Sequence, residues 1–254
     1  MTLHSNIGNE WQKKDEATLR IELAAAFRLA VLNDWHESVS NHFSLALSDD
    51  GRRFLMNPRW RHFSRVKSSD LLVLDIDDEQ TMARSDAPDP SAWTIHGCIH
   101  AARPDARCIL HVHSTYATAL AALADPQIKP IDQNTARFFN RVAIDIEFGG
   151  IADDLEEGKR LVQALGNKRS MIMGNHGILV TAATVAEAYD ELYFLEKSCK
   201  TLILAYSTNQ PLNIMPDELA EKTALEWEDY REMPFAHFSE MCRLLDERDP
   251  SYAH

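Results

Sequence analysis

The chain has 254 residues, of which 45% are hydrophobic and 26% charged, a composition typical of a folded globular protein with a substantial buried core. Its 39 Asp and Glu residues outnumber its 26 Lys and Arg residues, and the net charge of −13 argues against nucleic acid or an anionic membrane surface as a partner. The start of the chain lacks the apolar core of a signal peptide, and no run approaches the roughly 18 apolar residues that span a bilayer, so we expect a cytoplasmic protein.

The chain is expected to form a single domain over residues 1–254. No tract of Gly, Ser or Pro is long enough to be a linker, and no internal repeat is visible. The four cysteines are scattered without a CxxC pair, a pattern more typical of buried thiols than of a disulfide framework. We therefore assign the cysteines no role.

The first part of the chain alternates between helical and extended patterns. Apolar residues at three- and four-residue spacing predict a helix over 16–35, with Asp15 as its N-cap. Alternating apolar residues predict strands over 39–47 and 53–58, which the turn-like "SDDG" joins into a β-hairpin. A third strand is predicted over 71–76.

The rest of the chain continues this mixture after Ser91. The predicted elements are a helix over 91–102, a strand over 107–113, a helix over 115–123, a loop around Pro130, a helix over 153–165, a strand over 170–181 broken by a Gly-Asn-His-Gly turn, and a helix over 185–206. Residues 207–254 form a tail in which prolines separate short helical pieces. This order predicts a mixed sheet covered by helices, of the α/β or α+β class.

Two histidines stand one residue apart at the end of a predicted strand. Residues two apart on a strand project to the same face, so His111 and His113 can reach one ion, and zinc-type metals favour imidazole nitrogen. An HxH pair alone is a weak motif. His176 adds a third imidazole, because Gly174 and Gly177 permit a tight turn that points it inward. Three histidines leave coordination positions open for water or substrate, as in catalytic metal sites.

Two long segments resemble the class II aldolase/adducin family, which includes L-fuculose-phosphate aldolase, L-ribulose-5-phosphate 4-epimerase and the adducin head domain. They are "IHGCIHAARPDARCILHVHSTYATALAAL" and "SMIMGNHGILVTAATVAEAYDELYFLEKSCKTL", within a similarity that runs from about residue 17 to residue 206. The resemblance implies a three-layer α/β/α sandwich around a largely antiparallel sheet, and a homotetramer with active sites between subunits. It also implies that His111, His113 and His176 bind a divalent metal, commonly Zn²⁺, with Mn²⁺ and Fe²⁺ as alternatives.

The sequence also departs from the aldolase pattern. Ala92 stands where the aldolases have an acid that binds metal or carries a proton. Asn41 and Ser91 match substrate-binding positions of the family, but "NPRW" replaces the Thr-Gly turn that holds a substrate phosphate. The tyrosine that acts from the adjacent subunit falls near Gln133 or Asn134. These departures, and segments such as "NPRWRHF", favour the adducin-like branch over a standard sugar-phosphate aldolase.

No catalytic residue is assigned from the sequence. His42, Asp132 and Glu147 are alternatives for the proton carrier that Ala92 does not provide. His96 either points into the metal cavity or is a hydrogen-bonded helix histidine, and the second interpretation is the simpler one.

Three functions remain open at this point. The first is a metal-dependent lyase of aldolase or decarboxylase type, which cleaves a C–C bond of a small oxygenated substrate through a metal-stabilised enolate. The second is a non-catalytic, oligomeric scaffold like adducin. The third is an iron-dependent oxygenase, since open positions beside three imidazoles also bind dioxygen. The identity of the bound metal distinguishes the three.

Overall fold

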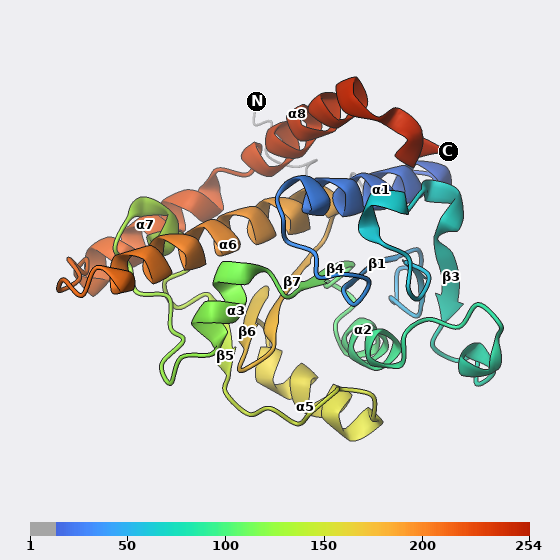
Figure 1. Cartoon of the computed structure of the whole chain (residues 1–254), viewed down its shortest axis with the longest axis horizontal. Coiled ribbons are helices and arrows are strands. Elements are labelled where there is room, and N and C mark those ends of the chain that lie inside the picture. Colours follow the sequence, from blue (N-terminus) through green and yellow to red (C-terminus); the bar gives the residue numbers. More distant parts are fainter. Residues whose placement is uncertain (1–13) are drawn as a thin grey trace, which may run out of the picture.

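The computed structural model describes residues 14–254, and a seven-stranded sheet runs through its centre (Figure 1). The strands are β1 (His42–Ala46), β2 (Arg53–Met56), β3 (Leu72–Asp75), β4 (Cys108–Val112), β5 (Val142–Asp145), β6 (Ser170–Met173) and β7 (Gly177–Ala182). Their order across the sheet is β3-β2-β1-β4-β7-β6-β5. Every neighbouring pair is antiparallel except β5 and β6, which are parallel. The sheet is therefore mostly antiparallel, as the family resemblance implied.

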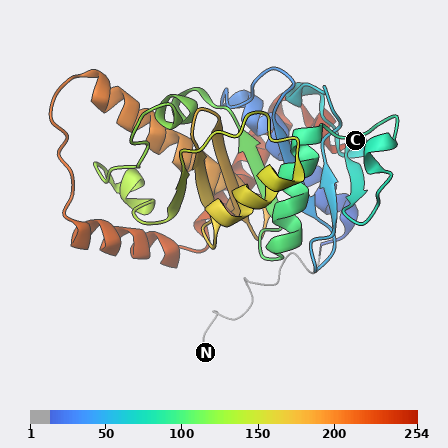
Figure 2. The same cartoon turned by 90° about the horizontal axis from the view of Figure 1, so that it is seen from below.

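Helices cover both faces of this sheet. They are α1 (Glu16–Leu32), α2 (Pro90–Ala102), α3 (Thr115–Ala121), α4 (Gln133–Arg137), α5 (Leu155–Leu165), α6 (Val185–Ser207), α7 (Asp217–Asp229) and α8 (Met233–Arg248). Helices α1 and α6 lie on one face with α8 packed outside them, and α2 and α5 lie together on the other face (Figures 1 and 2). The fold is a mixed α/β architecture.

The boundaries of α1 follow from local hydrogen bonds. Asp15 accepts a hydrogen bond from the backbone N–H of Thr18 at 2.8 Å, which confirms the predicted N-cap. The helix ends at Leu32, three residues earlier than predicted, because the Asn33 side chain donates to the Leu29 carbonyl and Asp34 takes a left-handed φ of 57°.

The two faces of the sheet have different cores. On the side of α1 and α6, the rings of Phe27, Phe43 and Phe63 pack with centroids 4.6–5.0 Å apart. On the side of α2 and α5, Ile95 and Ile109 belong to a second, smaller cluster. Because β4 lies between both cores, all five of its residues are buried, including His111.

The structure adds two elements where only a loop around Pro130 was predicted. Helix α4 has five residues and depends on a capping box between Asp132 and Thr135. Strand β5 has four residues at the edge of the sheet, too few for a clear alternation. The tail is also more regular than predicted, because α7 and α8 have 13 and 16 residues.

Two expectations from the sequence concern membrane-spanning segments and the state of the cysteines, and both refer here to residues 14–254. In that region no helix is both long and apolar enough to cross a membrane. All four cysteines are free thiols, and burial raises the pKa of the Cys199 thiol well above its ordinary value.

Candidate metal centre

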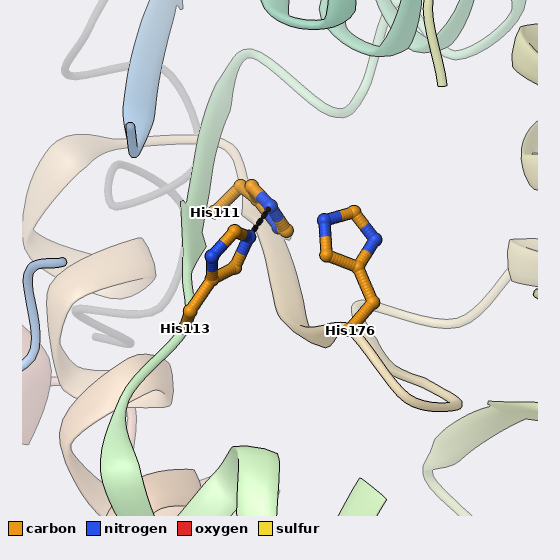
Figure 3. A group of neighbouring side chains, drawn as sticks. All are labelled: His111, His113 and His176. Atoms are coloured by element: carbon orange, nitrogen blue, oxygen red, sulfur yellow. Dashed lines mark hydrogen bonds between the residues drawn. The ribbon is translucent and has the colours of Figure 1, made fainter. Parts of the chain in front are cut away.

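Three imidazoles converge where β4, β6 and β7 end (Figure 3). His111 lies on β4, in register with His42 of β1 and Leu179 of β7, and His113 follows one residue after the strand. His176 lies in the turn between β6 and β7. The three ring centroids are 4.7–4.8 Å apart, and one nitrogen from each ring lies within 4.8 Å of the others.

The turn that carries His176 requires glycine on both sides. A Cβ on Gly177 would stand 2.5 Å from the Val112 carbonyl oxygen and 3.0 Å from the His113 ring. A Cβ on Gly174 would stand 2.9 Å from the Cα of Ile146. The backbone therefore approaches β4 and the chain after β5 so closely that only glycine is accommodated.

Hydrogen bonds fix the tautomers of His111 and His113. The Ile178 carbonyl oxygen accepts from His111 Nδ1 at 2.9 Å, and a Glu37 carboxylate oxygen accepts from His113 Nδ1 at 2.5 Å. In each neutral ring the proton is therefore on Nδ1 and the lone pair is on Nε2.

The two Nε2 atoms of His111 and His113 lie 2.9 Å apart. Lone pairs that face each other at this distance repel, and a shared cation removes the repulsion. The donor set thus suits one divalent ion of the zinc type, which is bound by imidazole nitrogen.

Burial favours the neutral form of His111 and of His176. It lowers the pKa of His111 well below its ordinary value, with a further contribution from the charges of His176 and His113. Burial and His113 lower the pKa of His176 to about 4. Neutral imidazole is the form that binds a metal, so these two rings are ready to bind an ion without first losing a proton.

A string of buried polar groups extends from this cluster toward α2. The ring of His42 stacks on His111 with centroids 4.8 Å apart, and its Nδ1 lies 2.8 Å from Nε2 of His96. The Ser44 hydroxyl then links Nδ1 of His96, at 2.5 Å, to Nε2 of His100, at 2.8 Å. His96 is therefore a hydrogen-bonded helix histidine, and among residues 14–254 its hydrogen bonds connect it to the cluster through His42.

The two predicted substrate-binding residues occupy different surroundings. Asn41 is buried beside the loop that carries Glu37, where its Oδ1 accepts from the Glu37 backbone N–H at 2.6 Å. Its Nδ2 is buried and has no hydrogen-bond partner within residues 14–254. Ser91 lies at the start of α2, and its hydroxyl donates to Asp89 at 2.7 Å. Between Ser91 and the three histidines, the described part of the chain shows no hydrogen bond.

The structure separates the candidate proton carriers. Asp132 caps α4 by accepting from the Thr135 backbone N–H at 2.7 Å, and the Glu147 side chain is 80% exposed. His42 is the candidate that contacts the histidine cluster. Ala92 is buried in a small apolar cluster with Phe54, and the acid nearest to it along the chain is Asp89, the N-cap of the same helix.

Glu37 is the site residue that the sequence analysis missed. It lies in the loop after α1, in which Asp34 and Ser38 have left-handed φ angles of 57° and 49°. No spacing relates Glu37 to His113, because only the antiparallel pairing of β1 with β4 brings the loop to the strand end.

The sequence matches known proteins over most of its length. The family model for the class II aldolase and adducin N-terminal domain matches residues 21–203. A putative aldolase class 2 protein of Caulobacter vibrioides is 31% identical over 84% of this chain and 79% of its own length. The decarboxylase NovR of Streptomyces niveus is 26% identical over 85% of this chain and 82% of its own length. Rat alpha-adducin is 31% identical over 74% of this chain, which is 25% of the adducin.

Solved structures have the same fold. An aldolase II superfamily protein from Pseudomonas syringae superposes with a TM-score of 0.85 at 33% identity, over 94% of this chain and 96% of that one. The family model spans most of the chain, and the similarity to the Pseudomonas syringae structure covers nearly all of it. The chain therefore belongs to the class II aldolase and adducin family.

Proposed function

We propose that this protein is a metal-dependent lyase that cleaves a C–C bond in a small oxygenated substrate. The observation that carries the proposal is the convergence of three imidazoles, two of which are oriented by hydrogen bonds to Ile178 and Glu37. Membership of the class II aldolase family supports a lyase-type role. We further propose Zn²⁺ as the ion, with Mn²⁺ or Fe²⁺ as alternatives.

In this proposal each residue near the cluster has a separate task. His111, His113 and His176 hold the ion, and Glu37 orients His113. A bound divalent ion supplies Lewis-acid stabilisation of the negative charge that develops on a substrate oxygen. Asn41 offers its buried, unpartnered Nδ2 as a donor to the substrate.

The preferred substrate in this proposal is a non-phosphorylated carboxylate. Ala92 itself supplies no acid, and a positioned acid or base typically contributes about 10²–10⁴ in rate to reactions that depend on proton transfer. Decarboxylation of a metal-chelated keto or hydroxy acid mainly needs an electron sink. The similarity to a protein named a decarboxylase supports this choice.

We propose that the working form is a cytoplasmic homotetramer. Beside the cluster, Phe148 contacts the His176 ring at 6.2 Å between centroids and is 52% exposed, and Ile151 is 80% exposed. Such apolar surface next to a polar site is typical of a subunit contact. Light scattering tests the assembly, and a monomer at micromolar concentration would contradict it.

A non-catalytic, adducin-like scaffold is the second candidate. The 31% identity to rat alpha-adducin favours it, because the adducin-type match covers 74% of this chain. The lyase requires a bound metal ion and turnover of a substrate, whereas the scaffold requires neither. An iron-dependent oxygenase would instead require Fe²⁺ and dioxygen.

Elemental analysis of purified protein tests the metal site first. We expect about one divalent ion per chain in the wild type and a large loss in His113→Ala, because removal of one of three ligands leaves an incomplete set. His254→Ala, which changes an exposed histidine outside the cluster, is the matched control. Full occupancy in His113→Ala would refute the site.

An assay of small keto and hydroxy acids, with fuculose phosphate and ribulose phosphate in parallel, tests the reaction. We expect turnover only among the acids and only with metal present. Efficient turnover of a sugar phosphate would contradict the substrate class, and absence of any turnover by metal-loaded protein would favour the scaffold.

A further inference from the structure

A cavity of about 780 Å³ lies at the ends of β6 and β7 that are opposite to the three histidines. Lys168 and Arg169, which precede β6, and Thr184, which follows β7, contribute to its wall. His176 instead lies in the turn that joins the other ends of the same strands. At about 3.4 Å per residue, the six residues of β7 put a separation on the order of 17 Å between the two places.

Helices α4 and α7 complete the wall of this cavity. They pack against each other beside α6, at the side of the molecule where β5 forms the edge of the sheet (Figures 1 and 2). The wall therefore combines one end of the sheet with the tail, and it contains no residue of the histidine cluster.

The cavity is positively charged in a strongly acidic chain. Its cationic lining residues are Arg137, Arg141, Lys168, Arg169 and Arg231. Its acidic lining residues are Glu187, Glu191 and Glu228. This excess in the lining contrasts with the net charge of −13 of the whole chain, and Asp190 and Glu221, just outside the lining, pair with two of the arginines.

Three of these cations are already engaged within the wall. The Arg137 guanidinium bonds to Asp190 at 2.8 Å and lies 4.8 Å from the centroid of the Phe194 ring. Arg141 pairs with Glu228 at 3.0 Å, and Lys168 donates to the carbonyl oxygen of Asn140. These contacts hold the wall in place.

The other two cations are available to a ligand. Arg169 and Arg231 are both exposed, and among residues 14–254 neither side chain makes a hydrogen bond or ion pair. A hydrogen bond from Arg103 lowers the pKa of the Asp105 carboxyl, and the charge of Arg169 also helps to lower it, at a distance longer than an ion pair. Two guanidinium groups without hydrogen-bond partners in one cavity match the oxygen atoms of a phosphate group, which Arg binds in a bidentate manner.

Two aromatic side chains lie on the same wall. The Trp227 indole is fixed by its Nε1–H, which donates to the Gln133 carbonyl oxygen at 3.0 Å. The Tyr230 ring is 63% exposed, and its centroid is 6.4 Å from that of Trp227. An exposed ring beside guanidinium groups that have no hydrogen-bond partner is typical of sites that stack a flat ring and hold an attached anion.

We propose that this cavity is a second ligand site, which binds a nucleoside phosphate. Arg169 and Arg231 hold the phosphates, and the exposed Tyr230 ring stacks on the base, beside the Trp227 ring, which is tilted from it by 59°. The volume of about 780 Å³ is within the roughly 300–1,000 Å³ of small-molecule sites. A polynucleotide is disfavoured, because the acidic surface of the whole chain repels a long phosphate backbone.

Calorimetric titration of the full chain with ADP, without added divalent ions, tests the proposal. We expect saturable binding, weakened about tenfold or more by Arg169→Ala and by Arg231→Ala, because each removes charge-assisted hydrogen bonds. Tyr230→Ala should weaken it several-fold through lost stacking. Inorganic phosphate should bind at least about tenfold more weakly than ADP, since it has no ring to stack.

Two variants locate the binding. Arg248→Ala removes an exposed arginine on α8 outside the cavity and should leave ADP binding unchanged. His113→Ala should also leave it unchanged, which separates this site from the histidine cluster. The proposal is overturned by absence of saturation up to about 5 mM ADP, by binding that survives the double variant Arg169→Ala/Arg231→Ala, by equal affinity for inorganic phosphate, or by loss in His113→Ala.

Discussion

The Glu37 carboxylate accepts a hydrogen bond from Nδ1 of His113 across 2.5 Å, which joins the loop after α1 to the end of β4. Glu37 is itself held by Asn41, whose side-chain oxygen accepts from its backbone N–H at 2.6 Å. A predicted substrate-binding residue thus also positions the group that orients a proposed metal ligand.

Replacement of Glu37 by Gln should weaken metal binding without emptying the site. The amide oxygen still accepts from His113, but the loss of the negative charge lowers the basicity of the ring, and partners of this kind typically change affinity by about 10–100-fold. Chelator competition measures the change. Glu79→Gln, an exposed acid outside the cluster, is the control, and equal affinity in the two variants would show that Glu37 has no role.

The sequence predicted the parts of the site that depend on short-range spacing. His111 and His113 share a strand face, and the glycines beside His176 indicate a turn, so the cluster was predictable once both strands were recognised. Glu37 was not, because its contact depends on which strands pair. The basic cavity combines α4, α7 and the start of β6, and the sequence shows no local pattern that relates them.

Gly177→Ala should both destabilise the fold and impair metal binding. The added Cβ would stand 2.5 Å from the Val112 carbonyl oxygen, so β4 or the turn must move, at a cost of about 1–3 kcal/mol in the free energy of unfolding. Urea unfolding and elemental analysis measure the two effects.

Gly97→Ala is the matched control for that change. Gly97 lies within α2, and its added Cβ would meet only Ile76 at an ordinary 3.7 Å. Alanine should therefore stabilise the helix by roughly 0.5–1 kcal/mol. If both variants changed stability equally, the close approach at Gly177 would not matter.

Glu196→Ala should loosen the helix that follows the histidine pair. The buried Glu196 carboxylate accepts hydrogen bonds from the Ser114 hydroxyl at 2.7 Å and from the Ala117 backbone N–H at 2.9 Å, at the start of α3. Its removal leaves buried donors unsatisfied, and each typically costs about 1–3 kcal/mol. Chemical unfolding measures the loss.

Glu196→Gln retains an acceptor oxygen and should lose less stability than Glu196→Ala. Glu240→Ala, which removes an exposed acid from α8, should change stability little. Equal losses in Glu196→Gln and Glu196→Ala would show that the charge, and not the hydrogen bonds, is what matters.

His100 should make the protein less stable in acid. Burial lowers its pKa to about 3, with a further contribution from Arg107, while the Ala106 backbone acts in the opposite direction. The Nε2 atom of His100 bonds to the Ser44 hydroxyl, which also bonds to His96. The Phe54 ring packs against the His100 ring.

The sign of the effect follows from proton uptake on unfolding. The unfolded histidine takes up a proton below its ordinary pKa of 6.5, whereas the folded one stays neutral until about 3, so stability is full above pH 6.5 and falls as the pH is lowered. His100 should contribute about 1.4 kcal/mol per pH unit to this slope between those values. Urea unfolding of the wild type and of His100→Gln measures this slope. The titration is done at several pH values from about 4.5 to about 6.5, a range that lies between the folded and the unfolded pKa. The glutamine can still bond to Ser44 but does not titrate, so its slope should be smaller by about one proton, and identical slopes would show that His100 is protonated in the folded state.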